Sequence, residues 1–442
     1  MDTWRPAKLG ELVEIKHGFA FAGEYFRDEP PGDVLLTPGN FAIGGGFKDD
    51  KFKYYVGPVP DEFVLNKGDL IVTMTDLSKA ADTLGYPALV PDSKGARFLH
   101  NQRLGKVLIR HESPIRNDFL YYLLCSRPYR DEVLASATGT TVKHTAPERI
   151  KAFTFELPSL QEQAAIGHIL CALDDKIDLN RRMNETLEAM ARTIFKSWFV
   201  DFDPVHAKAE GRQPSGMDAA TAALFPDSFE DSPLGKIPKG WRACAVGDVI
   251  EVGGGSTPST KESGYWDGQI HWATPKDLSA LRSPVLLDTE RRITHAGVAQ
   301  IGSRVYPEGT VLLSSRAPIG YLAISEVATA VNQGMIAMVC ADNPSNHFMV
   351  HWTRENMEAI EGRASGTTFQ EISKSNFRLL PLTLPTPEIM KAFTEGVESL
   401  HRRIVSNVRE SNALAATRDT LLPKLISGEI RVGAHSAEVV PT

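Results

Sequence analysis

Two stretches of the chain repeat their apolar residues every three to four positions over about forty residues each. This a/d heptad pattern predicts two long helices that pair along a seam, at 158–200 and 386–430. Each helix should be about 60 Å long. The seam positions are Leu170, Ile177, Asn184, Ala191 and Trp198 with Leu173, Asn180, Leu187 and Ile194 in the first helix, and Val397, Ile404, Ser411, Arg418 and Leu425 with Leu400, Asn407, Leu414 and Leu421 in the second.

Asparagine occupies the same seam position in both predicted helices, at Asn180 and Asn407. A buried asparagine in a helix seam weakens the pairing but fixes its register and the choice of partner. The pattern is equally compatible with two asparagines that face the solvent. The sequence leaves these two interpretations open.

The helices belong to a long internal repeat. Residues 137–141 read Ala-Thr-Gly-Thr-Thr and residues 364–368 read Ala-Ser-Gly-Thr-Thr, which places Gly139 and Gly366 227 residues apart. Leu-Pro at 157–158 recurs at 384–385 with the same offset, as do the two seam asparagines. Because the register is constant over the similar segments, they are expected to share a structural role.

The repeat divides the chain into six predicted segments. The regions 1–157 and 240–385 mix short β-rich runs with turn residues and occasional helical stretches, which indicates two mixed α and β domains. Each precedes one long helix. Residues 201–239, rich in proline and acidic residues, are predicted to form a linker, and 431–442 a C-terminal tail.

Composition narrows the class of protein. The chain has 442 residues, 42% hydrophobic and 23% charged, as in a packed globular protein of several domains. It has neither a run long enough to cross a membrane nor a signal-peptide pattern, so we expect a cytoplasmic protein with no membrane partner. The net charge of −7 argues against a surface coated with basic residues. The four cysteines are widely spaced and suggest neither a zinc ribbon nor a disulfide framework.

Catalytic motifs are missing from the sequence. The glycine triplets lack the spacing of a P-loop or a dinucleotide fingerprint, and HExxH and GxSxG are absent. The Asn/Asp-Pro-Pro-aromatic tetrapeptide of adenine methyltransferases is absent as well. His347 and His351 stand four apart on a predicted helix, but no third ligand is near in sequence, which favours a packing role over a metal site. We therefore expect no enzyme and no bound metal.

Polar loops rich in hydrogen-bond donors punctuate both domains. Ser, Thr and Asn contact phosphates in protein–DNA complexes, whereas Arg, Lys, Asn and Gln read base edges. Ordinary turn chemistry explains most such residues equally well. The candidate DNA-binding residues are Asn40, Thr75, Lys79, Asn101, Arg103, Lys143 and His144 in the first domain, and Thr257, Thr260, Lys261, Thr274, Lys276, Arg316 and Gln333 in the second.

Several segments resemble the specificity subunit of type I restriction-modification enzymes. The segment 191–205, Ala-Arg-Thr-Ile-Phe-Lys-Ser-Trp-Phe-Val-Asp-Phe-Asp-Pro-Val, is similar to the end of that family's central conserved region, and 157–163 to its beginning. Residues 256–260, 270–278 and 314–320 resemble a target-recognition domain. Residues 421–430 resemble the end of the second conserved region. The start of the second helix departs from the family pattern, because 385–390 lacks the Gln-Glu-Gln of the first.

The resemblance implies an α+β fold with two target-recognition domains separated by two long helices, paired as an antiparallel coiled coil in a pseudo-twofold repeat. It implies a subunit without an active site, in which each domain reads one half of a bipartite, asymmetric site in double-stranded DNA. Two methyltransferase subunits, which carry S-adenosylmethionine, would dock on the helices, and restriction-translocase subunits would join them. This chain itself would hold no cofactor.

The candidate positions for methyltransferase docking or helix pairing are Ile177, Asn180, Leu187, Ile194, Trp198, Ile404, Asn407, Leu414 and Leu421. An alternative assignment is a coiled-coil scaffold protein that binds only other proteins. A fused methyltransferase is disfavoured by the missing motifs. Specific protection of a DNA site by the assembled complex would distinguish DNA readout from the scaffold.

Overall fold

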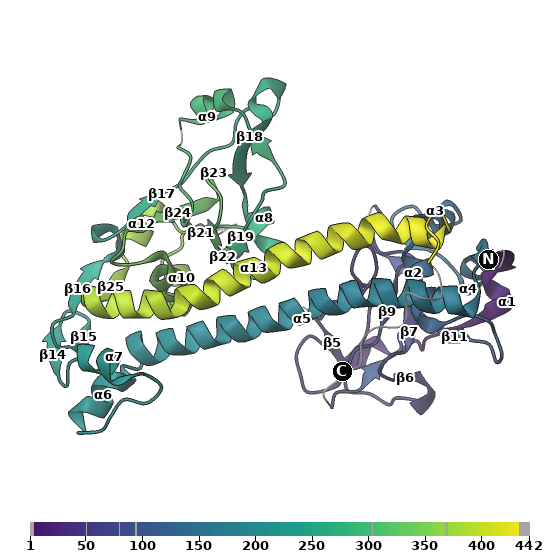
Figure 1. The fold of residues 1–442 in the computed structure, drawn as a ribbon, viewed down its shortest axis with the longest axis horizontal. Coiled ribbons are helices and arrows are strands. Elements are labelled where there is room, and N and C mark those ends of the chain that lie inside the picture. Colours follow the sequence, from purple (N-terminus) through teal and green to yellow (C-terminus); the bar gives the residue numbers. More distant parts are fainter. Residues whose placement is uncertain are drawn as a thin grey trace. The chain divides into compact units, whose positions relative to one another are not determined.

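The fold alternates a mixed α/β region and a long helix twice along the chain (Figure 1). The computed structural model describes residues 4–49, 51–78, 80–92, 95–302, 304–366 and 370–432. The chain forms two compact units. Unit 1 holds the residues up to 176 together with those from 414 onward, and unit 2 holds residues 177–413. Each long helix therefore contributes one part to each unit.

The described residues of unit 1 form four sheets and four short α-helices besides the ends of the two long ones. Its central sheet has the strand order β2-β11-β7-β9, with all neighbours antiparallel. Its elements are β1 (Arg5–Lys8), α1 (Leu9–Leu12), β2 (Val13–His17), β3 (Phe26–Arg27), β4 (Asp33–Leu35), β5 (Lys53–Tyr55), β6 (Val64–Leu65), β7 (Leu70–Thr73), β8 (Thr75–Asp76), β9 (Pro87–Leu89), β10 (Phe98–Leu99), β11 (Leu104–Ile109), α2 (Asn117–Cys125), α3 (Arg127–Ala135), β12 (Lys143–His144), α4 (Pro147–Lys151) and β13 (Thr154–Leu157).

Unit 2 contains a five-stranded sheet of order β17-β24-β21-β22-β19 and a three-stranded sheet of order β20-β18-β23. Its elements are α6 (Asp203–Ala209), α7 (Ala219–Leu224), β14 (Phe229–Ser232), β15 (Gly235–Pro238), β16 (Arg242–Ala245), β17 (Glu251–Gly253), β18 (Trp266–Ala273), α8 (Pro275–Ser279), β19 (Val285–Leu286), β20 (Arg292–Ile293), α9 (His295–Ile301), β21 (Val311–Ser315), β22 (Ile319–Ser325), β23 (Thr329–Val331), β24 (Met335–Val339), α10 (Asn346–Glu355), α11 (Met357–Gly362), α12 (Lys374–Arg378) and β25 (Pro381–Leu384).

The two units repeat the same framework of strands. In unit 1, β1 pairs with β13 so that Arg5 lies opposite Leu157; in unit 2, β16 pairs with β25 so that Arg242 lies opposite Leu384. The order β2-β11-β7-β9 corresponds to β17-β24-β21-β22. The short helix after each bridging loop, α4 or α12, begins at residues 227 apart. The sequence offset therefore marks equivalent positions in space within each unit.

Two forty-residue helices, α5 (Leu160–Phe199) and α13 (Pro387–Ile426), account for the heptad pattern. Ser159 and Glu162 exchange hydrogen bonds at the start of α5, as the predicted capping box requires. Trp4 and Arg431 also donate to Glu162, which fastens this helix start within unit 1. The helix α13 continues through Pro423 to Ile426, although proline is expected to weaken its last turn.

The predicted seam is present in both units. In unit 2, Leu187 packs against Ile404 and Val405, and Phe195 lies against Phe393 with ring centroids 6.0 Å apart. Residue numbers rise along α5 as they fall along α13, so the helices are antiparallel there. In unit 1, Leu170 shares a core with Leu421 and Leu425, and Arg418 forms a 2.7 Å ion pair with Asp174. The guanidinium at this seam position is thus neutralised by the facing helix.

The seam asparagines are buried. The side chains of Asn180, Asn184 and Asn407 are 0%, 4% and 1% exposed. The amide of Asn407 donates to Asn184 Oδ1 at 2.8 Å, and the amide of Asn180 donates to the Glu410 carboxylate at 2.8 Å. The Asn180 amide also lies within reach of the Asn407 carbonyl and of Ser411 Oγ. Of the two interpretations left open by the sequence, the buried one is confirmed.

The segment 201–239 is folded, whereas the sequence predicts a linker. It carries α6, α7 and the β14–β15 hairpin, and Val205, Phe225 and Ile237 enter the main core of unit 2. The prolines suggested a linker, but Pro204 lies in the first turn of α6, where its fixed φ and missing N–H are tolerated. Trp198 meets Phe225 edge to face at 5.1 Å, so this segment closes the end of the helix seam.

Three histidines lie where the mixed α/β region of unit 2 meets its long helices. His347 and His351 lie buried on α10, and the ring of His347 is 4.9 Å from that of His401 on α13. His401 Nε2 pairs with the Glu326 carboxylate at 2.7 Å. Burial lowers the pKa of His347 to about 4, with the His401 charge acting in the same direction. Burial and Arg354 lower the pKa of His351 to about 3.

Replacing Asn407 with alanine should lower the free energy of unfolding by about 1–3 kcal/mol, because Asn184 would be left with a buried amide lacking its partner. Urea denaturation measures the change. Asn412→Ala is the matched control, since Asn412 is exposed on the same helix. The double variant Asn184→Leu with Asn407→Leu should be close to neutral in stability. Equal effects of the Asn407 and Asn412 substitutions would contradict the role of the buried pair.

Acidification should destabilise unit 2. The unfolded chain protonates His347 and His351 near pH 6.5, whereas the folded chain does so only near pH 4 and pH 3, so stability falls as the pH falls through this window. At about pH 5.5 the loss should be about 1 kcal/mol per histidine relative to about pH 7.5.

Urea midpoints at the two pH values test this expectation. His351→Phe should reduce the pH dependence, whereas His295→Asn, at an exposed position on α9, should leave it unchanged. An unaltered pH dependence in the His351 variant would show that other groups govern acid stability.

Candidate nucleic-acid interface

Each unit builds the same three-stranded bridge beside its central sheet. In unit 1, Met74 N–H donates to the Arg103 carbonyl, and the Thr145 N–H donates to Met74. His144 bridges to Thr75 on one side and to Thr138 on the other. These backbone bonds bring together Thr75, Arg103, Lys143 and His144 of the predicted set; Arg103 and His144 are exposed, whereas Thr75 is buried.

Unit 2 repeats these bonds one by one. Ser315 N–H donates to the Gly334 carbonyl and the Ile372 N–H donates to Ser315, at 2.9 and 3.1 Å. Glu371 bridges to Arg316 and to Ser365. Glu371 thus occupies the place of His144, and Arg316 the place of Thr75. The position of Glu371 follows from the 227-residue offset, although sequence reasoning did not single it out.

The bridging loop explains why glycine recurs in the repeated motif. Gly139 and Gly366 have φ values of +95° and +125°, a region in which a side chain is strained. A Cβ on Gly139 would also stand 1.9 Å from the Val142 carbonyl oxygen. The glycine of the repeated Ala-Thr/Ser-Gly sequence therefore provides the backbone conformation that the turn before His144 requires in unit 1, and Gly366 has a positive φ as well.

Side chains at the bridge differ between the units. In unit 1, Thr75 Oγ1 lies 3.2 Å from His144 Nδ1. In unit 2, the Arg316 guanidinium lies 3.4 Å from the Glu371 carboxylate, and Ser315 Oγ is within 3.5 Å of it. The same backbone therefore presents an alcohol and an imidazole in one unit and an ion pair in the other.

Asparagines at the neighbouring turn have a structural role. The N–H of Arg103 donates to Asn101 Oδ1, and the N–H of Gly334 donates to Asn332 Oδ1, both at 2.9 Å. These side chains shape the turn, and the residues that follow them, Gln102 and Gln333, are exposed. Thr257 Oγ1 donates to the Gln333 side chain at 2.6 Å, which links two of the predicted loops.

Two tryptophans hold the loop 256–261 against unit 2. Trp272 Nε1 donates to the Ser256 carbonyl at 3.2 Å, and Trp266 Nε1 donates to the Ser259 carbonyl at 3.0 Å. The Arg291 guanidinium covers the Trp266 ring, 3.3 Å from its centroid. The exposed side chains of Thr257, Thr260 and Lys261 therefore project from an anchored backbone. These anchoring tryptophans were not among the sequence candidates.

The remaining predicted residues fall into different environments. Thr274 caps α8 through Asp277, and Lys276 on that helix pairs with Glu290 at 2.6 Å while remaining exposed. Asn40 is 1% exposed and donates to the carbonyls of Lys48 and Lys51, so its side chain is occupied by a turn. Lys79 lies outside the described residues. DNA contact by this set stays a prediction.

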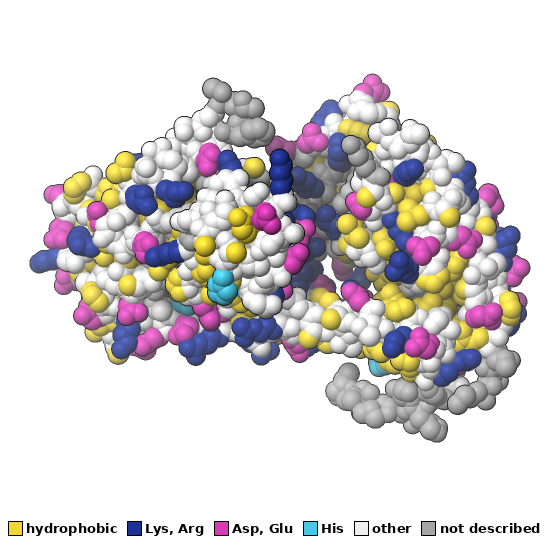
Figure 2. Space-filling view, turned by 90° about the horizontal axis from the view of Figure 1, so that it is seen from above, with side chains coloured by type: hydrophobic (Ala, Val, Ile, Leu, Met, Phe, Trp, Pro, Cys, Tyr) yellow, Lys and Arg dark blue, Asp and Glu magenta, His cyan; other side chains and the backbone are white. Residues whose placement is uncertain are grey.

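Charges of both signs share the surface. Figure 2 shows Lys and Arg side chains interspersed with Asp and Glu, and much of the face between them is uncharged. Residues 1–157 carry 20 basic and 21 acidic groups, and residues 240–385 carry 12 and 14. Neither region has the basic surplus that drives strong non-specific DNA binding. Any nucleic-acid recognition by this surface has to rely on a few directed contacts.

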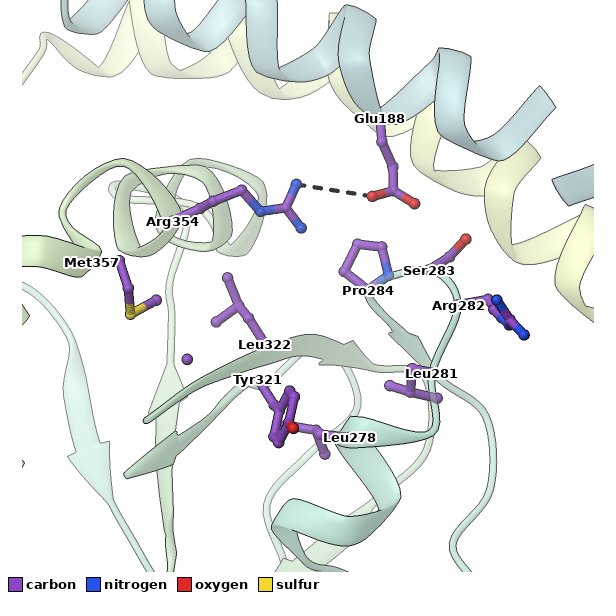
Figure 3. A pocket seen from close by; sticks show the side chains of 11 residues that line it. Glu188, Leu278, Leu281, Arg282, Ser283, Pro284, Tyr321, Leu322, Arg354 and Met357 are labelled. Atoms are coloured by element: carbon purple, nitrogen blue, oxygen red, sulfur yellow. Dashed lines mark ion pairs between the residues drawn. The ribbon is translucent and has the colours of Figure 1, made fainter. Parts of the chain in front are cut away.

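A small pocket lies between α5 and the mixed α/β region of unit 2. Glu188 and Arg354 point toward one another across it at 3.9 Å, above Leu322 and Pro284 (Figure 3). Burial raises the pKa of Glu188, although the Arg354 charge and a hydrogen bond with Ser283 oppose the shift. The pocket measures about 210 Å³, below the roughly 300 Å³ at which small-molecule sites begin. We assign the ion pair to packing.

Within the part of the chain that the structure describes, no three His, Cys, Asp or Glu side chains gather as metal ligands. His347 and His351 are buried against the helices, as a packing role requires. None of the described helices is both long and apolar enough to span a membrane.

Helix-seam residues are mostly covered. Asn180, Asn407 and Ile404 are buried, and Leu187, Ile194, Trp198 and Leu421 are partly buried against neighbouring side chains. Ile177 and Leu414 are half-buried. The apolar side chains of α5 that remain exposed in unit 2 include Leu179 and Met190, which are 52% and 48% exposed.

Known proteins resemble this chain over most of its length. A family model described as "Type I restriction modification DNA specificity domain" matches residues 1–189 and 238–415. The type I restriction enzyme HindI specificity subunit of Haemophilus influenzae is 26% identical over 356 residues, which cover 71% of this chain and 77% of that protein. The MjaIX specificity subunit of Methanocaldococcus jannaschii is 35% identical over 188 residues, or 42% of this chain and 43% of that relative.

The fold also has a solved counterpart. The S subunit of a type I restriction-modification system from M. genitalium covers 96% of this chain with a TM-score of 0.54 at 15% sequence identity. The match covers 96% of that chain as well, so the succession of two mixed regions and two long helices is shared. The family match spans both repeats, and this chain belongs to the family of type I restriction-modification DNA specificity proteins.

Proposed function

We propose that this chain is the DNA sequence-specificity subunit of a type I restriction-modification complex, and that each recognition region reads one half of a bipartite, asymmetric site in double-stranded DNA. The observation that carries the proposal is the bridge built twice on the same backbone bonds. A conserved backbone with different side chains is suited to reading two different sequences in one orientation. The scaffold alternative gives no reason for this arrangement.

We also propose that the chain is not catalytic and works in the cytoplasm, where its DNA is found. Two methyltransferase subunits carrying S-adenosylmethionine would supply adenine methylation, and restriction-translocase subunits would supply cleavage. Of the two roles predicted for the seam positions, helix pairing fits their burial better than methyltransferase docking. The exposed face of α5 that carries Leu179 and Met190 is the better candidate for docking in unit 2.

Exchanging residues 240–385 for the same region of a relative should change one half of the methylated site and leave the other half intact. Each region carries its own bridge and its own loops, so the two readouts are expected to be independent. Sequencing of modified adenines in DNA exposed to the assembled complex measures the outcome. A change in both halves would contradict independent reading, and the absence of any sequence preference in the unaltered complex would support the scaffold alternative.

Changing Leu179 and Met190 together to serine should weaken binding of the methyltransferase subunit at least about tenfold, because two exposed apolar side chains would be lost from the interface. Co-purification and titration of the subunits measure the effect. Leu379→Ser is the matched control, since Leu379 is 66% exposed on the recognition region rather than on the helix. Full methyltransferase binding by the double variant would exclude this face as the docking surface.

A further inference from the structure

The two bridges each carry one arginine, but from different strands. Arg103 precedes β11 in unit 1, and its equivalent by backbone hydrogen bonding in unit 2 is Gly334. Arg316 follows β21 in unit 2, and its equivalent in unit 1 is Thr75. Unit 1 therefore has arginine at the first of these positions and a small residue at the second, whereas unit 2 has the reverse.

Space at the bridge of unit 2 fits this exchange. A Cβ added to Gly334 would stand 3.3 Å from Arg316 Nε, so the Arg316 side chain lies over the glycine. In unit 1 the Cβ of Arg103 occupies that place, and the neighbouring Thr75 is small. Gly334 does not have a positive φ, so its conformation does not itself require glycine. Glycine at 334 leaves room for the arginine of the next strand.

The surroundings of the two arginines differ in charge. Glu371 lies beside Arg316 and pairs with its guanidinium at 3.4 Å, and the Arg316 side chain is 35% exposed. His144 occupies the equivalent place in unit 1, with Lys143 next to it in the chain. Arg103 is exposed and makes no ion pair with another described residue. The Arg316 guanidinium is thus paired with a carboxylate, whereas the carboxylate at the unit 1 bridge, Asp76, lies opposite Lys143 in the strand register.

We propose that Arg103 and Arg316 are equivalent specificity-determining residues, one for each half-site, and that each reads a base with two acceptors, such as guanine. The inference rests on the proposed function. A guanidinium fork matches O6 and N7 of guanine in the major groove. Glu371 is a positioning residue, which orients the Arg316 fork before DNA arrives.

Relocating the arginine within unit 2 tests the equivalence. Arg316→Thr alone should relax the preference at one base pair of the second half-site and lower methylation of the preferred sequence about tenfold or more. Adding Gly334→Arg to this variant moves the arginine to the position equivalent to Arg103. Removal of Arg316 takes away one close contact of a Cβ at 334, and the neighbours that remain are Pro275 Cγ at 3.2 Å and Asn332 Oδ1 at 3.4 Å. The double variant should recover preference at the same base pair. Arg242→Thr, on an exposed strand position of β16, is the control.

The readout is the base composition of sites methylated by the assembled complex on a randomised DNA library. A relaxed position in Arg316→Thr that the double variant restores would support the inference. An unchanged base preference in Arg316→Thr would overturn it. So would a double variant that is as stable to urea as Arg316→Thr but does not recover the preference. Absence of site preference in the unaltered complex would instead overturn the proposed function.

Glu371→Gln separates positioning from direct contact. The substitution keeps the shape and removes the charge, so Arg316 should still reach the base but with a less constrained fork. The preference at the Arg316 base pair should weaken less than in Arg316→Thr, while binding to unrelated DNA should increase because a neutralising carboxylate is lost. Unchanged non-specific binding together with full base preference would contradict the positioning role.

Discussion

The buried amides in the helix seam are the constraint on which the arrangement of unit 2 depends. A seam of leucines alone would tolerate a shift of one heptad, because one leucine replaces another. With Asn184 hydrogen-bonded to Asn407, such a shift would leave two amides without partners in an apolar surrounding, at a cost of several kcal/mol. The seam therefore exchanges some stability for one register. Everything attached to the helices in unit 2, from His401 to the aromatic cluster at Phe393, inherits that register.

Internal duplication explains how one chain can carry two similar bridges with different side chains. The backbone bonds of the bridge are the same in both units, so the turn residues that make them are under the same constraint. Side chains that project from the bridge do not take part in these backbone bonds and are not constrained by them. His144 and Glu371 accordingly differ in both charge and size. The framework is repeated and the chemistry is free to change. This separation is what a protein with two unlike half-sites requires.

The helices were predictable from sequence because their signal is periodic and long. Heptads over forty residues give a pattern that loops and turns cannot imitate, and the repeat of Gly139 at Gly366 marked the bridging turn. The candidate interface was harder to predict from the sequence, since it is assembled from residues far apart in the chain. Asn40 and Thr274 had suitable chemistry, yet a turn and a helix cap occupy their side chains. Glu371 was overlooked because a lone carboxylate gives no sign of its neighbour Arg316 until the strands are paired.

Charge pairing at the proposed interface of unit 2 would favour discrimination between DNA sequences over affinity. Arg316, Lys276 and Arg292 each have a carboxylate partner within 3.4 Å, so the surface attracts phosphates weakly. A guanidinium already satisfied by a carboxylate gains from DNA only when a base offers acceptors of matching geometry. With a non-matching base, the ion pair between Arg316 and Glu371 stays in place and binding gains little free energy. In the proposed complex, phosphate affinity would come largely from the partner subunits, and this chain would contribute the choice of sequence.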